Sequence, residues 1–101
     1  MNERQVLALL KDGQVVFHYP LKVHFRPGGG DFGVSVPKRH FKRAVKRNLL
    51  KRRVREAFRL QQGRLGGKAY DIFIFYVGKE VEEYERIEKS VAQVLDDLAA
   101  C

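Results

Sequence analysis

Basic side chains are the most conspicuous chemically active groups in this chain, and they are concentrated in one segment. Residues 38–59 hold eleven Lys or Arg against a single acid, Glu56. This segment therefore carries +10, whereas the whole chain carries +8 and the other 79 residues sum to −2. A localised basic cluster is typical of proteins that bind nucleic acid, because cations neutralise phosphates. The segment predicts a polyanionic partner.

The same segment has the residue spacing of a helix with two distinct faces. Its apolar positions follow the i, i+4, i+7, i+8 pattern of a buried stripe: Leu50, Val54, Ala57 and Phe58. A second stripe points largely away from the first: Asn48, Lys51, Arg52, Arg55 and Arg59. Cations within about three turns can meet a row of phosphates along an RNA helix. A solvated basic face without a specific ligand is the alternative.

Asn48 is the uncharged member of the second stripe. Its amide offers both a donor and an acceptor, which suits a base edge or a 2′-hydroxyl of RNA. A local backbone cap near the start of the helix is the alternative for this residue.

Groups that hydrolyse RNA without help are not gathered anywhere in the sequence. Half of the twelve acids lie in the last predicted helix, where the spacing spreads them along a solvent face. His18 and His24 are expected on one strand face but about 20 Å apart, too far to bind one metal ion. His40 lies among cations and either contacts RNA or is an idle surface residue. We expect no catalytic residue and no metal site in this chain.

The elements that must position these residues are predicted from apolar periodicity and turn residues. A first helix is expected over Glu3 to Asp12, with Gly13 as a left-handed cap. A strand over Val15 to Phe25 follows, and Pro20 indicates a bend or an edge position within it. A glycine-rich turn leads into a second strand over Phe32 to Val36, which we expect to form a hairpin with the first.

The second half of the chain continues with a strand and a helix. The nearly continuous apolar run from Ala69 to Val77 predicts a strand in mid-sheet, buried on both faces. Periodicity then predicts a last helix over Val81 to Ala99. The order α-β-β-α-β-α indicates a single α+β domain over residues 1–101, a sandwich of a small, mostly antiparallel sheet with helices packed on it.

Composition sets the remaining bounds. A chain of 101 residues with 45% hydrophobic residues is long enough for one modest core. The single cysteine, Cys101, leaves no partner for an intramolecular disulfide and suits a reducing cytoplasm. The apolar runs are too short for a signal peptide or a membrane span, so we expect no membrane partner.

Three stretches together resemble the pattern of the bacterial ribonuclease P protein family. They are Ser35-Val36-Pro37-Lys38-Arg39, Ala44-Val45-Lys46-Arg47-Asn48-Leu49-Leu50-Lys51-Arg52 and Arg55-Glu56-Ala57-Phe58-Arg59. Gly13 and the strands at 21–25 and 71–75 match the same pattern, so the resemblance covers most of the chain. It implies a fold like that of ribosomal protein S5 domain 2. It also implies a protein subunit of ribonuclease P, the ribonucleoprotein endonuclease that removes the 5′ leader from precursor tRNA.

The resemblance also implies where RNA binds. Contacts to the catalytic RNA carry over to Arg47, Asn48, Lys51, Arg52 and Arg55. The basic approach to this helix would be formed by Lys38, Arg39, Lys42, Arg43 and Lys46, and Arg59 of the second stripe would extend the RNA-binding surface. A cleft for the single-stranded leader carries over to Phe17, Tyr19, Lys22 and His24. The partners would be ribonuclease P RNA and precursor tRNA, with no dedicated protein partner. The RNA would be catalytic and would hold most of the Mg²⁺.

Three residues and one loop depart from the family pattern, and other functions remain as rivals. Leu49 stands where the family usually has arginine, Leu10 where an aromatic is often found, and His24 where tyrosine is familiar. The loop from Lys38 to Arg43 is about one residue longer than the commonest pattern. A ribosomal or general RNA-binding protein of similar fold would bind ribosomal RNA and leave leader cleavage unaffected. A DNA-binding module is disfavoured because no zipper heptads or helix-turn-helix pair accompany the basic helix. A membrane-surface helix is disfavoured because the apolar stripe is narrow.

Overall fold

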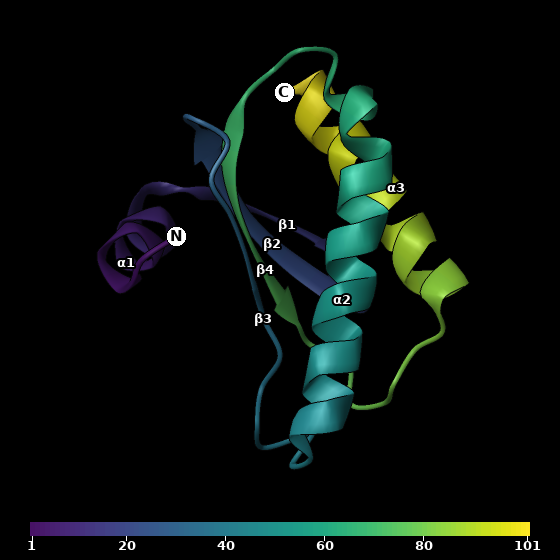
Figure 1. Ribbon diagram of the computed structural model, residues 1–101. Helices are drawn as coiled ribbons and strands as arrows, with labels where there is room; N and C mark the ends of the chain where they lie inside the picture. Colours follow the sequence, from purple (N-terminus) through teal and green to yellow (C-terminus); the bar gives the residue numbers. More distant parts are fainter.

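The computed structural model describes all 101 residues as a four-stranded sheet between unequal helical layers. Helices α2 and α3 cover one face of the sheet, and the short helix α1 lies on the other side (Figure 1). The α+β class is therefore confirmed. The elements in chain order are α1 (Glu3–Asp12), β1 (Gln14–His18), β2 (Leu21–Pro27), β3 (Phe32–Ser35), α2 (Ala44–Gln61), the 3-10 turn η1 (Gln62–Leu65), β4 (Tyr70–Tyr76) and α3 (Tyr84–Ala100).

The single strand expected over Val15 to Phe25 is wrong, because the chain reverses at Tyr19 and Pro20 and forms two strands. Strands β1 and β2 pair antiparallel, with Phe17 opposite Lys22. Proline cannot donate to a sheet ladder, which favours a turn at this position over a bend within one strand. The fold therefore has one strand more than expected.

The reversal also changes which side chains share a face. Phe17 lies on the same face as Lys22 and His24, because opposed residues in an antiparallel pair point to the same side. His18 is opposite Leu21 on the core face, where its Nε2 lies 2.6 Å from Oδ2 of Asp97 on α3. The expectation that His18 and His24 share a face is wrong.

The position of β4 in mid-sheet is confirmed, but the expected hairpin of the first two predicted strands is wrong. The strand order is β1-β2-β4-β3, with β4 antiparallel to β2 and parallel to β3. The glycine-rich loop carries the chain past β4 to the far edge of the sheet. A parallel pair needs a long crossover, and α2 with its flanking loops provides the connection from β3 to β4.

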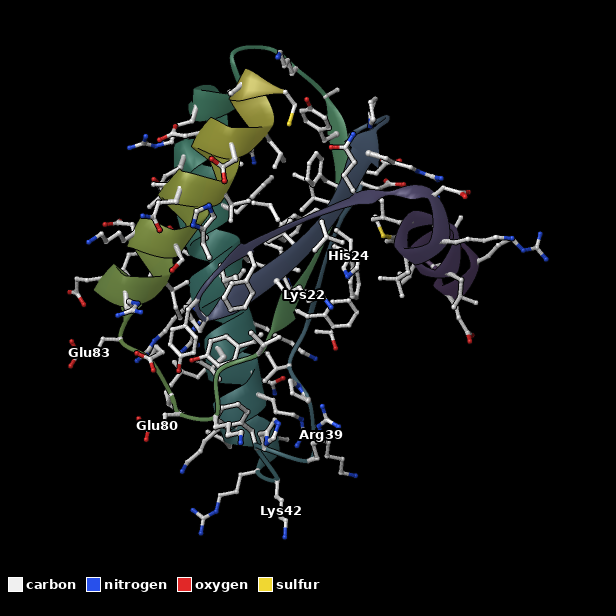
Figure 2. All side chains as sticks on the ribbon, turned by 180° about the vertical axis from the view of Figure 1, so that it is seen from behind. Lys22, His24, Arg39, Lys42, Glu80 and Glu83 are labelled. Atoms are coloured by element: carbon white, nitrogen blue, oxygen red, sulfur yellow. The ribbon has the colours of Figure 1, made fainter.

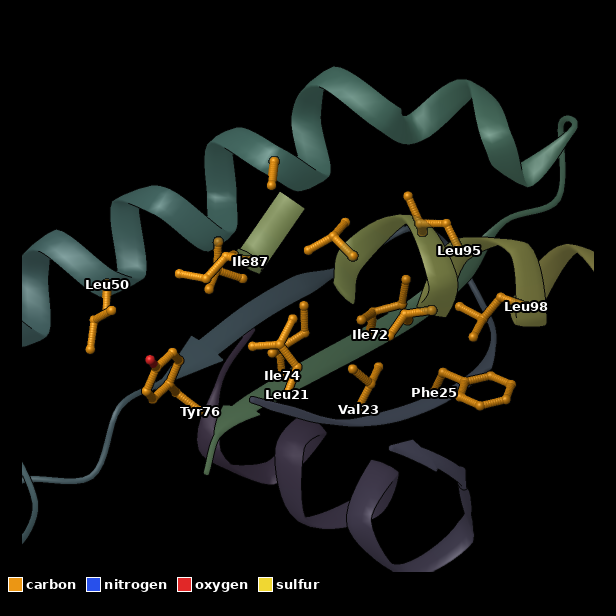
Figure 3. Close-up of a cluster of buried hydrophobic side chains, with 14 of the residues drawn as sticks. Leu21, Val23, Phe25, Leu50, Ile72, Ile74, Tyr76, Ile87, Leu95 and Leu98 are labelled. Carbon is orange, nitrogen blue, oxygen red and sulfur yellow. The ribbon is translucent and has the colours of Figure 1, made fainter. Parts of the chain in front are cut away.

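The core lies between the sheet and helices α2 and α3 (Figure 3). Three of the four apolar positions predicted on α2 are fully buried: Leu50, Val54 and Ala57. The fourth, Phe58, is half-buried and stacks on Phe32 of β3. Burying a large aliphatic side chain stabilises the fold by roughly 1.5–3 kcal/mol.

Strand β4 is fully buried on one face only, so the expectation of two buried faces is wrong. Ile72 and Ile74 are buried in the core, whereas Phe73 and Phe75 on the other face are half-buried. The long apolar run reflects aromatic residues on an incompletely covered face of the sheet. We call this face the open face.

Helix α1 spans the predicted Glu3 to Asp12, but its terminal glycine is not left-handed. Gly13 has a φ of −83°, and a Cβ there would lie 2.5 Å from the Leu9 carbonyl oxygen and 2.9 Å from that of Phe25. Glycine is therefore required by close packing of the backbone against α1 and β2.

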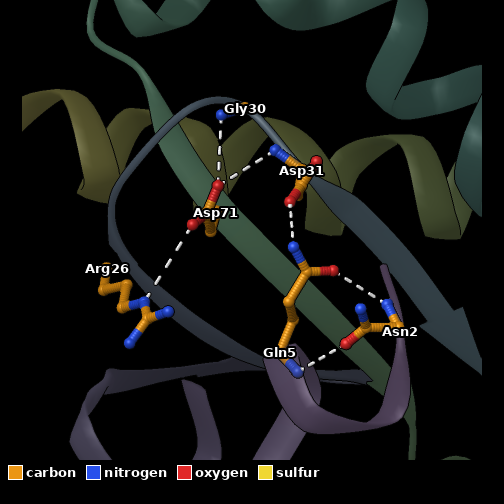
Figure 4. A network of polar contacts seen from close by, with 6 residues as sticks. All are labelled: Asn2, Gln5, Arg26, Gly30, Asp31 and Asp71. Carbon is orange, nitrogen blue, oxygen red and sulfur yellow. Dashed lines mark hydrogen bonds and ion pairs between the residues drawn. The ribbon is translucent and has the colours of Figure 1, made fainter. Parts of the chain in front are cut away.

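A polar network ties the start of α1 to the loop before β3 (Figure 4). Asn2 and Gln5 form a reciprocal capping box. The side-chain amide of Gln5 also donates to Asp31 at 3.2 Å. The carboxylate of Asp71 on β4 accepts from the backbone N–H groups of Gly30 and Asp31 at 3.2 and 3.0 Å. The network fixes α1 over one end of the open face.

Helix α3 begins at Tyr84, three residues later than the expected Val81. The hydroxyl of Tyr76 donates to the Glu80 carbonyl at 2.6 Å and accepts from the Glu82 N–H at 3.0 Å. These bonds hold the segment in a non-helical conformation. Burial raises the pKa of Tyr76 to about 12, so the hydroxyl stays protonated. None of the helices combines the length and apolar content needed to cross a bilayer.

Candidate RNA-binding surface

A groove runs over the open face of the sheet, between the end of α1 and the loop that follows β3. Its volume is about 610 Å³. Leu10 of α1 contributes one wall, and Arg39 and His40 contribute the other. Lys22 and Phe75 line it from the sheet. No carboxylate lines the groove, so its local charge is positive.

His24 is a largely enclosed polar side chain of the groove. It is only 9% exposed, and its ring packs edge-on against Phe75 with centroids 5.6 Å apart. Its Nδ1 is buried without a hydrogen-bond partner. Burial, helped by the charge of Lys22, lowers the pKa of His24 and favours the neutral imidazole. An unpaired buried polar atom is costly, and no other group of the protein offsets that cost at this nitrogen.

The four predicted cleft residues divide into two groups. Lys22 and His24 line the groove, and the exposed Phe17 lies beside them on the same face. Tyr19 lies apart, in the turn between β1 and β2. Its hydroxyl donates to Glu82 at 3.4 Å and its ring lies 5.2 Å from the guanidinium of Arg86, so it faces the start of α3.

The basic loop that precedes α2 borders the groove. Arg39 lines the groove, and Lys42 lies farther along the same loop (Figure 2). The cations of this loop and of the first turn of α2 are exposed: Lys38, Arg39, Lys42, Arg43 and Lys46.

Arg47 has a structural task within this basic region. One of its Nη atoms donates to the Phe41 carbonyl at 2.7 Å and to the Lys42 carbonyl at 3.0 Å. Helix α2 has no side-chain cap at its N-cap residue Arg43. Arg47 therefore holds the basic loop against the first turn of α2, and only its remaining donors are free for RNA.

The outer stripe of α2 is largely free of internal contacts. Asn48, Arg52 and Arg55 are exposed and make no side-chain hydrogen bond within the protein, and Lys51 is half-buried. Asn48 lies four residues after the helix start at Ala44, so it is not a cap. Arg59 differs, because its Nη2 pairs with Glu56 at 2.6 Å.

Several residues of this surface and its supporting contacts were not predicted from the sequence. Ser35 and Phe75 line the groove, and the backbone alternation of β3 and β4 was the only signal for them. Arg53 donates to the Glu82 carbonyl at 2.6 Å and joins α2 to the loop before α3. No three His, Cys, Asp or Glu side chains converge as metal ligands.

Comparison with known proteins gives this surface its context. Residues 2–99 match the family model of ribonuclease P. The chain belongs to the ribonuclease P protein family. It is thus linked to the endoribonuclease ribonucleoprotein that processes tRNA.

Individual ribonuclease P proteins are similar over most of their length. The ribonuclease P protein component of Porphyromonas gingivalis is 31% identical over 107 residues, which cover 94% of this chain and 78% of that protein. That of Thermotoga maritima is 39% identical over 88 residues, covering 84% of this chain and 74% of that protein.

Solved ribonuclease P proteins share the fold. The protein from Thermotoga maritima in complex with 1-(4-fluorophenyl)-2-thiourea has a TM-score of 0.80 at 28% identity, over 91% of this chain and 92% of that one. The protein from Staphylococcus aureus has a TM-score of 0.81 over 96% of this chain and 91% of that one, and at 24% identity it supports the fold alone.

Proposed function

We propose that this ribonuclease P protein binds the catalytic RNA through the basic loop and α2, and the single-stranded 5′ leader of precursor tRNA in the groove. In this way it assists the endonucleolytic cut that removes the leader and generates the mature 5′ end. The observation that carries the proposal is the continuity of the two surfaces. Arg39 and His40 belong to the basic loop and also line the groove, so one protein can hold both RNAs next to each other.

The groove has the properties that suit an unpaired strand. Phe17 and Phe75 offer ring surface on which bases can stack, at roughly 1–3 kcal/mol per base. Lys22 and Arg39 can meet the phosphates, and Nε2, the ring nitrogen of His24 that is not buried, can bond to a base edge or a 2′-hydroxyl. A strand bound here would distinguish precursor from mature tRNA, because only the precursor has a leader.

The basic surface would act by neutralisation. Bringing the leader against the catalytic RNA places two polyanions side by side, and the cations of the loop and α2 reduce their repulsion. We assign hydrolysis to the RNA with its Mg²⁺, because the side chains of this protein supply neither a clustered ligand set nor a positioned base and nucleophile. We place this activity in the cytoplasm, which a single unpaired cysteine suits.

Cleavage of precursor tRNA at low magnesium tests the role of α2. A bacterial ribonuclease P RNA would be assayed alone, with the wild-type protein and with an Arg52→Ala/Arg55→Ala variant. The protein should restore cleavage, and the variant should restore less at the same concentration. Failure of the wild-type protein to stimulate at any concentration, with tight binding to ribosomal RNA instead, would overturn the proposal.

The groove needs a separate comparison. A Lys22→Ala/His24→Ala variant should weaken binding of precursor tRNA by the RNA–protein complex and leave mature tRNA unaffected. Lys89→Ala removes an exposed cation of α3 and serves as the control. Equal weakening of precursor and mature tRNA would show that the groove does not hold the leader.

A further inference from the structure

A second cavity lies at the opposite end of α2 from the groove. Its volume is about 490 Å³, and it is enclosed by the C-terminal half of α2, the start of β3 and the loop before β4. It shares no lining residue with the groove. Its size falls within the range of sites for small ligands. We call it the aromatic pocket.

Two stacked rings form the centre of the aromatic pocket. Phe32 of β3 and Phe58 of α2 lie with centroids 4.3 Å apart and planes at 28°. Both rings line the cavity and both are half-buried, so part of their surface stays open to a ligand. Exposed ring surface next to the core is expensive unless something covers it. A flat aromatic ligand is the group that stacks best on such rings.

The charged side chains that line the pocket are all positive. Arg55, Arg59 and Lys68 line it, and no carboxylate does. Arg59 pairs with Glu56, and the Nζ of Lys68 donates to the carbonyls of Ala99 and Cys101 at 2.7 and 2.8 Å. Arg55 makes no hydrogen bond or ion pair and is the cation most available to an anion.

The stacked rings and the cations that line the pocket together suit one nucleotide, which has a flat base and an anionic phosphate. Arg55 and Arg59 also belong to the outer stripe of α2, so an RNA lying along that stripe passes the mouth of the pocket. We propose that the aromatic pocket receives one unpaired nucleotide of the ribonuclease P RNA, with its base against Phe58 and Phe32 and its phosphate on Arg55. This inference rests on the proposed binding of that RNA by α2.

A pair of charge-matched variants separates the pocket from general attraction to RNA. Arg52→Ala and Arg55→Ala each remove one exposed cation from the same helix, but only Arg55 lines the pocket. Chemical probing of the ribonuclease P RNA with wild-type protein should reveal a single unpaired base that becomes protected. That protection should persist with Arg52→Ala and be lost with Arg55→Ala.

A third variant tests the rings without changing charge. Phe58→Leu keeps an apolar side chain but removes the stacking surface, and thermal unfolding would establish that it still folds. It should weaken binding to the RNA by about tenfold, the equivalent of 1.4 kcal/mol, while the salt dependence stays the same. If Phe58→Leu fails to fold, the Arg52 and Arg55 pair still decides the matter.

The outcomes distinguish failure of the pocket from failure of the wider proposal. Tight binding of the RNA by all three variants, with no protected base, would overturn the pocket and leave RNA binding by α2 intact. A protected base in precursor tRNA instead of the ribonuclease P RNA would also overturn it. No binding of the ribonuclease P RNA by the wild-type protein would overturn both.

Discussion

The same strands form both faces of the β-sheet, but one face is buried in the core and the other is only partly covered. On the core face, Val23 and Ile74 lie against α2 and α3 and are fully buried. On the open face, their immediate neighbours His24 and Phe75 lie in a groove that only the short α1 and a loop border. Apolar and aromatic groups on both faces would gain from being covered, but the protein itself covers only the core face completely.

The difference shows how a small domain can keep a binding surface without losing its fold. The core face supplies the cooperative packing, so the open face does not have to contribute much to stability. It can therefore hold a neutral histidine with an unpaired nitrogen, a half-exposed ring and exposed cations. These groups are costly or idle in the free protein, and the proposed binding of RNA would use them.

Two neighbouring residues on β4 test whether the two faces of the sheet differ in their contribution to stability. Ile74→Ala should lower the free energy of unfolding by about 2–4 kcal/mol, because it leaves a cavity in the core. Phe75→Ala should cost less than half as much stability but weaken leader binding by about 1–3 kcal/mol. Urea denaturation and the ratio of precursor to mature tRNA affinity would measure the two effects. Equal losses of stability would mean that the open face is part of the core.

A substitution at Asp71 tests the polar network that holds α1 over one end of the open face. Asp71→Ala removes the acceptor for Gly30 and Asp31 and should lower the free energy of unfolding by about 1 kcal/mol. Amide hydrogen exchange should quicken in α1 and in the glycine-rich loop, while the core amides of β4 keep their relative protection. Asp96→Ala, on the surface of α3, is the control. Unchanged exchange in α1 would contradict the role of the network.

The salt dependence of RNA binding distinguishes ionic contacts from the contacts of the open face. Five phosphate contacts by the basic helix would give a log–log slope of affinity against salt of about −3.5. Arg52→Ala should make the slope shallower by about 0.7, whereas Phe75→Ala should leave it unchanged. Binding titrations from 50 to 200 mM salt would measure both slopes. A shallower slope for Phe75→Ala would argue against a stacking role.

The smallest expected effect concerns pH and His24. Burial holds its pKa in the folded protein below the ordinary 6.5, so the unfolded chain takes up the proton first as pH falls. The contribution of this residue to stability is therefore complete above pH 6.5 and decreases below it, toward the lower pKa of the folded state. Denaturation from pH 7.5 to 5.5 should show a smaller loss for His24→Gln than for the wild type. Identical pH profiles would show that His24 is not desolvated.

The parts of the molecule that were predicted from sequence are those with a local pattern. Helix α1 and the buried stripe of α2 repeat at helical spacing, and the apolar run around Ile74 identified the central strand. The basic loop and the outer stripe of α2 needed only residue type and position. Their exposure in the structure agrees with the surface expected for RNA, although contact with RNA stays a prediction.

The features that were missed depend on contacts between distant residues. Alternation runs unbroken through Tyr19 and Pro20, so the exchange of faces at the turn is invisible without knowing that β1 pairs with β2. The parallel pairing of β3 with β4 is equally non-local. Arg47 is a cation of the basic segment and was therefore predicted to bind RNA. Only its hydrogen bonds to the carbonyls of Phe41 and Lys42 reveal its structural role. The aromatic pocket was missed because Phe32 and Phe58 are distant in the sequence and contact each other only in the folded protein.

The central position of β4 in the sheet affects how the protein folds during its synthesis. During synthesis β1, β2 and all of α2 emerge before β4, and the pairing of β2 with β4 joins residues as distant as Leu21 and Tyr76. A lone two-stranded hairpin is marginally stable in water, and such long-range pairing is slow to form. The nascent chain therefore exposes its cationic segment before it has a core. Cellular RNA therefore encounters either the folded protein or an unfolded nascent chain that is strongly basic.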